Sequence, residues 1–91
     1  MSHSRFDVVF SGRVQGVGFR YTSNQVARRF EVTGWVKNLP DGTVQMVVEG
    51  KPSELESYLD AVTAETHGRV AGREIHRKSA TGEFSGFEIR H

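Results

Sequence analysis

The chain has 91 residues, a net charge of +1 and no cysteine. A chain of this length forms one domain, which we expect to span residues 1–91 around a single two-layer core. The composition excludes disulfides, thiolate metal ligands and a thiol nucleophile, and no apolar run reaches the ~20 residues of a membrane span.

The N-terminal part of the chain predicts a strand followed by a helix. It begins without the apolar segment of a signal peptide, so we expect a cytoplasmic protein. Apolar residues alternate over 6–12, which predicts a strand with one buried face. Apolar residues at steps of three and four then predict a helix over 19–30, with Arg28 and Arg29 in its last turn.

The middle of the chain predicts a β-hairpin. Residues 32–38 and 43–50 form its two strands. Between them the sequence LPDG, Leu39–Gly42, places proline and glycine where a tight turn favours them. Asn38 is the last residue of the first of these strands and therefore stands at the entrance of the turn.

The last third of the chain predicts a second helix and two further strands. The helix lies within residues 51–68, where Ser53 and Glu56 fit a capping box. Strand candidates follow at 69–78 and at 86–91, and the second of them is short.

The order of these elements predicts an α+β fold. A β-α-β-β-α-β order is typical of the ferredoxin-like α/β sandwich (βαββαβ), in which two helices cover one face of an antiparallel sheet. In that topology the first and second strands run parallel, with the third strand between them. Because this fold hosts many unrelated functions, function has to be inferred from the site.

A glycine-rich loop joins the first strand to the first helix. Gly16 and Gly18 permit backbone dihedrals that turn successive N–H groups inward, and the helix N-terminus adds partial positive charge. Arg20 adds a permanent charge and a planar fork that matches phosphate oxygens. These features predict a phosphate site built from the backbone amides of Arg13, Val14, Gln15, Gly16, Val17 and Gly18.

Asn38 is expected to face Arg20 across this site. The carboxyl ends of the first and second strands lie at the same edge of the sheet, roughly 10 Å apart across the intervening strand. An arginine side chain and a bound tetrahedral anion fill such a gap. The charge distribution agrees, because residues 1–38 carry a net charge of +4 and residues 39–91 a net charge of −3.

Each of these features has a simpler explanation when it stands alone. A glycine-rich turn is often only a turn, an arginine near a helix start is usually solvated, and an asparagine before a turn is usually a local cap. Their convergence at one edge of the sheet favours a functional site. Surface or structural roles are expected for the four histidines, none of which is placed against the loop: His3, His67, His76 and His91.

Three stretches of the sequence resemble the acylphosphatase family. GRVQGVGFR over 12–20 and GWVKNLPDGTV over 34–44 are similar to that family's signature pair, and GEFSGFEIR over 82–90 is similar to its C-terminal end. The resemblance covers nearly the whole chain. The segment TAETHGRVAG over 63–72 departs from the proline-containing stretch that family members often carry there.

The resemblance implies a hydrolase that cleaves the carboxyl-phosphate bond of acyl phosphates. It implies that Arg20 binds the substrate phosphate, that Asn38 orients the attacking water, and that the loop Arg13–Gly18 is the phosphate cradle. No metal or cofactor is expected, since no cluster of Asp, Glu or His accompanies the loop. The expected partners are a small acyl phosphate and inorganic phosphate, as product or inhibitor, with no nucleic acid and no membrane, and the chain is expected to be a monomer.

Two alternative functions stay open at this point. A ferredoxin-like module that binds nucleic acid would carry QGVGFRYT, which resembles an RNA-binding pattern, on its third strand and not before its first helix. It would also need a basic, aromatic sheet face. The outward positions expected on the central strands are neither: Asp7, Val9, Ser11, Gln45, Val47 and Glu49. The other alternative is a domain for handling carbamoyl phosphate inside a larger maturation protein, which the compactness of the chain argues against.

Overall fold

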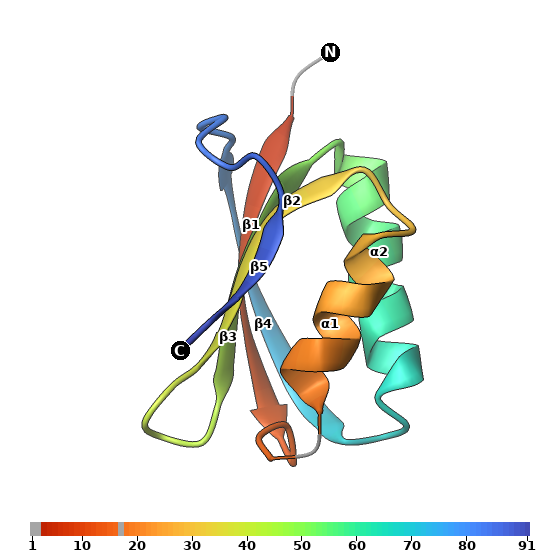
Figure 1. Cartoon of the computed structure of the whole chain (residues 1–91), viewed down its shortest axis with the longest axis vertical. Helices are drawn as coiled ribbons and strands as arrows, with labels where there is room; N and C mark the ends of the chain where they lie inside the picture. Colours follow the sequence, from red (N-terminus) through yellow and green to blue (C-terminus); the bar gives the residue numbers. More distant parts are fainter. Residues whose placement is uncertain (1–2, 17) are drawn as a thin grey trace.

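Two helices cover one face of a five-stranded sheet in the structure, a computed structural model that describes residues 3–16 and 18–91 (Figure 1). The strands lie in the order β4-β1-β3-β2-β5. The elements in chain order are β1 (Ser4–Gly12), α1 (Phe19–Ala27), β2 (Val32–Asn38), β3 (Val44–Gly50), α2 (Pro52–Glu65), β4 (Val70–Ser79) and β5 (Phe87–Arg90). The predicted α+β sandwich is confirmed, with β3 between β1 and β2.

The sheet is mixed, whereas an antiparallel sheet was expected. β1, β3, β2 and β4 pair antiparallel, but β5 pairs parallel to β2. The chain leaves β4 at one edge of the sheet, crosses the end of the sheet and returns along the other edge (Figure 1). A strand that returns in this way runs opposite to β4, and therefore in the same direction as β1 and β2.

The core lies between the sheet and the helices and follows from the alternation in the strands. On β1, the side chains of Phe6, Val8 and Phe10 face the helices and are at most 2% exposed. The rings of Phe10 and Phe19 lie 5.0 Å apart between centroids, which packs the first residue of α1 against the end of β1. The remaining buried members of the core are Val14, Val26, Ala27, Val32, Val36, Val44, Met46, Val48, Leu55, Tyr58, Leu59 and Val62.

Helix α1 ends at Ala27, three residues before the predicted end. The amides of Arg28 and Arg29 donate to the carbonyl groups three residues back, at 3.2 and 3.0 Å, so the chain leaves the helix in a tight turn. Phe30 still packs on the core, with its ring 6.1 Å from that of Tyr58. The apolar period therefore continues past the end of the helix, and Arg28 and Arg29 lie outside its last turn.

Helix α2 begins with Pro52 and has no side-chain cap, so the predicted capping box of Ser53 and Glu56 was wrong. Lys51 is the N-cap residue, and proline at the first helical position needs no N–H partner and has a backbone angle already suited to a helix. The helix ends at Glu65, and neither α1 nor α2 in the described part has the length and apolarity to cross a membrane.

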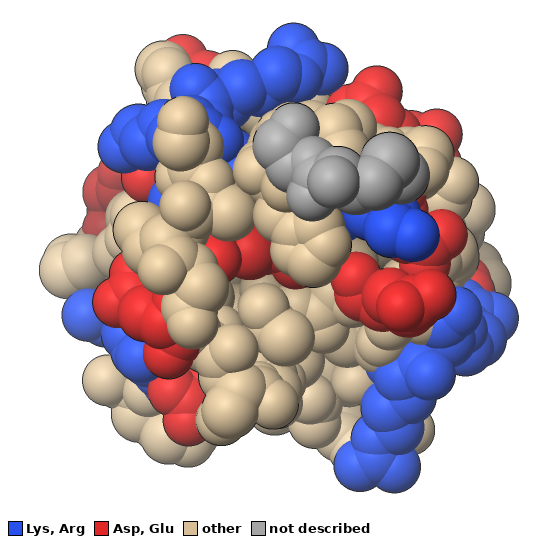
Figure 2. All heavy atoms as spheres, turned by 90° about the horizontal axis from the view of Figure 1, so that it is seen from above, with Lys and Arg blue, Asp and Glu red and all other residues tan. Residues whose placement is uncertain are grey.

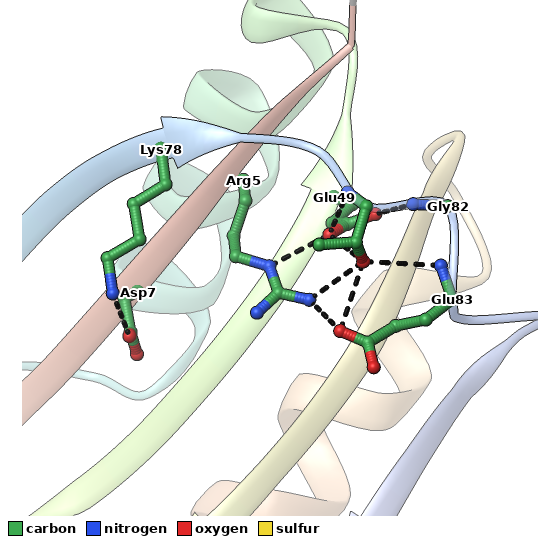
Figure 3. Close-up of polar contacts among 7 residues, drawn as sticks. Arg5, Asp7, Glu49, Lys78, Gly82 and Glu83 are labelled. Carbon is green, nitrogen blue, oxygen red and sulfur yellow. Dashed lines mark hydrogen bonds and ion pairs between the residues drawn. The ribbon is translucent and has the colours of Figure 1, made fainter.

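A carboxylate anchors the loop of residues 80–86, called here the 80–86 loop, to the end of the sheet. Glu49 accepts hydrogen bonds from Arg5 Nε at 2.8 Å, from the Thr81 amide at 2.9 Å and hydroxyl at 3.0 Å, and from the Gly82 amide at 3.0 Å (Figure 3). Glu83 pairs with the same arginine. Because β5 follows this loop, the Glu49 anchor fixes where β5 starts.

The environment of Glu49 lowers the pKa of its side chain. The side chain is 4% exposed, and burial alone would raise the pKa. The hydrogen bonds from the Thr81 and Gly82 amides, the Arg5 guanidinium and the Thr81 hydroxyl outweigh that effect and lower the pKa of Glu49 from 4.5 to about 2. Figure 2 looks at this end of the molecule and shows acidic and basic groups interspersed, so this face has no single sign of charge.

Candidate active site

The loop after β1 is held at its start by contacts with the rest of the fold. The amide of Arg13 donates to the carbonyl of Arg69 at 2.9 Å. The side chain of Val14 is 1% exposed and belongs to the core. The Arg13 amide, which the sequence included in the expected cradle, is thus engaged within the protein.

Two glycines shape the second half of this loop. Gly16 and Gly18 have φ values of 74° and 79°, which other residues rarely adopt. A Cβ atom at either position would meet nothing within 4 Å, so the backbone angle and not lack of space calls for glycine. Val17, which sequence reasoning included in the cradle, lies outside the described residues.

Helix α1 starts at the same point and directs its positive end to the loop. Gly18 is its N-cap residue, and its carbonyl accepts the amide of Thr22 at 2.9 Å. The first turn of a helix leaves backbone N–H groups without partners in the helix, and this turn contains no acidic residue. The loop and the helix start therefore offer donors and positive charge, with no nearby carboxylate in that turn.

Arg20 stands in the first turn of α1 and is half-buried. Its Nη1 donates to the carbonyl of Arg90 at 3.2 Å and lies 3.3 Å from Nδ1 of His91. No carboxylate of the described residues forms an ion pair with it. The end of β5 thus orients the guanidinium and leaves its charge unneutralised.

Asn38 ends β2, beside Val44 at the start of β3. Its Oδ1 atom is buried and has no hydrogen-bond partner within residues 3–16 and 18–91. Buried polar atoms are usually paired, so an unpaired acceptor marks a position where a ligand or water completes the bonding. Asn38 Oδ1 is thus available to accept a hydrogen bond.

These groups meet in one cleft of about 270 Å³. It lies at the end of the sheet where the loop after β1 approaches the end of β2, at the lower end of Figure 1. Its lining residues are Val14, Gly16, Gly18, Phe19, Arg20, Tyr21, Asn38, Ile89 and His91. The structure therefore brings Arg20 and Asn38 together with the described glycines of the loop, and no acidic side chain is in this lining.

Sequence reasoning missed the contribution of β5 to the cleft. Ile89 and His91 both line it, although a surface or structural role away from the loop was expected for His91. The register of β5 explains this, because Arg90 pairs with Lys37 and the chain then reaches the level of Asn38. The parallel pairing of the edge strand β5 with β2 has no local sequence signal.

A larger hollow, about 650 Å³, lies beside the Glu49 anchor and is less suited to an anion, because its charged lining residues are Glu31 and Glu49, with His3 as its one histidine. Within the described part, no group of three or more His, Cys, Asp or Glu side chains is arranged to hold a metal ion. The Arg20 cleft, in contrast, is lined by an arginine and by the N-terminal end of α1, without a carboxylate side chain.

Comparison with known proteins gives likenesses that extend along the whole chain. The acylphosphatase family model matches residues 6–89. An acylphosphatase of Syntrophotalea carbinolica is 43% identical over 91 residues, covering 99% of each chain. An acylphosphatase of Methanospirillum hungatei is 42% identical over 88 residues, covering 94% of this chain and 96% of the relative. The crystal structure of acylphosphatase from Bacillus subtilis superposes with a TM-score of 0.89 at 31% identity, over 97% of this chain and 99% of that one.

Proposed function

The chain belongs to the acylphosphatase family and is an enzyme of that class, and on this premise we propose how its cleft acts. It hydrolyses the carboxyl-phosphate bond of a small acyl phosphate to a carboxylate and inorganic phosphate. The loop amides and Arg20 hold the phosphoryl group, and Asn38 orients the attacking water. The reaction needs no metal or cofactor, and a single chain supplies the whole site.

The phosphoryl group is held by donors that are in place before it binds. We expect the backbone amides of Val14, Gln15, Gly16 and Gly18 to donate to its oxygens, and the start of α1 adds about half a positive charge. Arg20 contributes a planar pair of donors that matches two phosphate oxygens. Such preorganised donors stabilise the charge that develops on the transferring group.

The unpaired Oδ1 of Asn38 is the observation that carries the proposal. An acceptor in this position takes a hydrogen bond from a water molecule and aims the oxygen lone pair of that water at phosphorus. A carboxamide is too weak a base to remove the proton. Its role is to position the nucleophile.

The leaving group explains why so few residues suffice. The water oxygen forms a bond to phosphorus while the bond from phosphorus to the acyl oxygen breaks, and the electron pair leaves with the carboxylate. A carboxylic acid has a pKa of about 4, so the leaving oxygen needs no proton from a general acid. One proton of the attacking water passes to a phosphoryl oxygen and the other stays on the attacking oxygen. The products are a carboxylate and dihydrogen phosphate, which then releases a proton to solvent near neutral pH.

The proposal is tested by hydrolysis of benzoyl phosphate in the presence of a chelator. We expect turnover at an undiminished rate and competitive inhibition by inorganic phosphate. In Asn38→Ala we expect kcat to fall ~100-fold, because one preorganised group is lost, while the inhibition constant for phosphate changes less than ~3-fold. Loss of activity with chelator would contradict the metal-free reaction. Weakened phosphate binding with unchanged kcat in Asn38→Ala would contradict the role of Asn38.

A further inference from the structure

The side chain of Gln15 connects the loop after β1 with the turn between β2 and β3. Its Nε2 donates to the carbonyl of Leu39 at 2.7 Å and to the carbonyl of Thr43 at 2.7 Å. These contacts join residues 24 and 28 positions apart in the sequence, and the side chain is partly buried. They are the only direct side-chain hydrogen bonds found between residues 13–16 and the β2–β3 turn in the described part.

The two carbonyl groups belong to the turn that begins directly after Asn38. Thr43 also accepts the amide of Leu39 at 2.9 Å, and Leu39 accepts the amide of Gly42 at 3.2 Å. Gln15 therefore gives each carbonyl a second hydrogen bond. Because both neighbours are acceptors, only the NH₂ end of the carboxamide fits there, and both of its hydrogens are used.

The hydrogen bonds of Gln15 to Leu39 and Thr43 form a bridge between two segments that both contribute to the site. Val14 is fixed in the core before it, and Gly16 follows it in the cradle. Leu39 follows Asn38 directly in the chain, so a shift of the turn moves the Asn38 carboxamide. The bridge thus links the backbone that holds phosphate to the backbone that carries the water-orienting oxygen.

We propose that Gln15 is a positioning residue that sets the separation between the phosphate cradle and Asn38. The inference rests on the function proposed above and adds a role for a side chain to which only a backbone role had been assigned. Gln15 need not touch the substrate. Its effect is on the alignment of water with phosphorus, where a displacement of about 1 Å costs about 100-fold in rate.

The inference is tested with Gln15→Met, which keeps the length of the side chain and removes both donors. Gln45→Met is the matched control, since Gln45 is a partly buried glutamine on β3 that donates to Asp7 and does not contact the turn. For Gln15→Met we expect kcat for benzoyl phosphate to fall ~10- to 100-fold and the inhibition constant for phosphate to change less than ~3-fold. For Gln45→Met we expect both constants to stay within about 2-fold of wild type.

A double-mutant cycle separates positioning from general structural damage. If Gln15 acts through Asn38, then Gln15→Met changes kcat by less than ~3-fold in an Asn38→Ala background. Hydrogen exchange should also show faster exchange of the Leu39 and Gly42 amides in Gln15→Met and not in Gln45→Met. Gln15→Leu is the second variant if the methionine variant does not fold.

Failure of this inference is distinguishable from failure of the proposed function. Additive losses in the cycle, or a wild-type kcat in Gln15→Met, would overturn the positioning role while a slow Asn38→Ala variant leaves the proposed function standing. Unchanged exchange of the turn amides would also overturn it. A wild-type kcat in Asn38→Ala itself would overturn the proposed function.

Discussion

The two ends of the central strands differ in whether their buried polar groups have hydrogen-bond partners within the protein. Near the start of β1, Glu49 is surrounded by donors and lies beside Arg5, in the cluster of Figure 3. At the other end, Asn38 Oδ1 has no partner and Arg20 has no carboxylate partner within residues 3–16 and 18–91. At one end the buried carboxylate has its hydrogen bonds within the protein, and at the other end a buried acceptor is unpaired within residues 3–16 and 18–91.

This difference separates stability from activity along a single sheet. A buried group with all its hydrogen bonds satisfied contributes to folding, whereas an unpaired one costs free energy in the folded state. The Glu49 anchor also fixes the start of β5, whose far end contacts Arg20. The residues of the Glu49 anchor do not line the Arg20 cleft, so we expect the anchor to act on stability and not on turnover.

The largest effect is expected when the charge of the cleft is removed. We expect Arg20→Ala to lower kcat/KM for benzoyl phosphate about 1,000-fold, which corresponds to about 4 kcal/mol in the activation barrier. The reason is that the substitution removes the positive charge that stabilises the phosphoryl group. Arg20→Lys should recover only part of the rate, since lysine lacks the planar fork. Arg28→Ala is the control, an exposed arginine past the end of α1. Equal rates in Arg20→Ala and the control would remove Arg20 from the mechanism.

At the anchored end, the next largest effect is expected from acid. The pKa of Glu49 is about 2 in the folded protein and 4.5 as a reference, so the unfolded chain binds a proton first as the pH falls. Glu49 therefore stabilises the fold fully above pH 4.5, and about 3 kcal/mol is lost as the pH falls toward 2. Urea denaturation from pH 6 to pH 3 measures this, and Glu49→Gln should flatten the profile. Glu56→Gln, an exposed carboxylate paired with Arg77, should leave the profile steep.

A smaller effect at the same end sharpens the comparison. The Thr81 hydroxyl donates to Glu49 at 3.0 Å and also forms hydrogen bonds with Arg5 and Glu83, so Thr81→Val removes the hydroxyl contacts of the anchor and keeps the bond from the Thr81 amide. We expect a loss of about 1 kcal/mol in the free energy of unfolding and no change in kcat. Thr81→Ser keeps the hydroxyl and should retain more of the stability. A kcat that falls with stability in Thr81→Val would mean that the two ends are not separable.

The sequence allowed the site loop to be predicted because its signals are local. Gly16, Gly18 and Arg20 lie within a few residues of one another between a predicted strand and a predicted helix. The LPDG turn fixed the end of β2, and the β-α-β topology then placed Asn38 at the same edge of the sheet. Local patterns and a known topology were sufficient for this part of the cleft.

Other features depend on contacts that no local pattern encodes. His91 reaches the cleft because β5 crosses to the far edge of the sheet and pairs parallel with β2. Glu49 occupies an outward position on β3, as expected from alternation, yet it is buried because the 80–86 loop covers it. The capping box failed because Pro52 starts α2 one residue before Ser53. In the first two cases the tertiary arrangement decided between options that were equivalent in the sequence, whereas the start of α2 at Pro52 follows a local preference of proline for the first helical position.

The most direct test of the contrast between the two ends compares Asn38→Ala with Glu49→Gln in two assays, urea denaturation and benzoyl phosphate hydrolysis. We predict that Asn38→Ala keeps its free energy of unfolding within about 1 kcal/mol of wild type and loses ~100-fold in kcat. Glu49→Gln should lose about 2–3 kcal/mol of stability and keep kcat within about 3-fold. A stable Glu49→Gln with impaired turnover, or an Asn38→Ala that unfolds readily while turning over at the wild-type rate, would contradict the account.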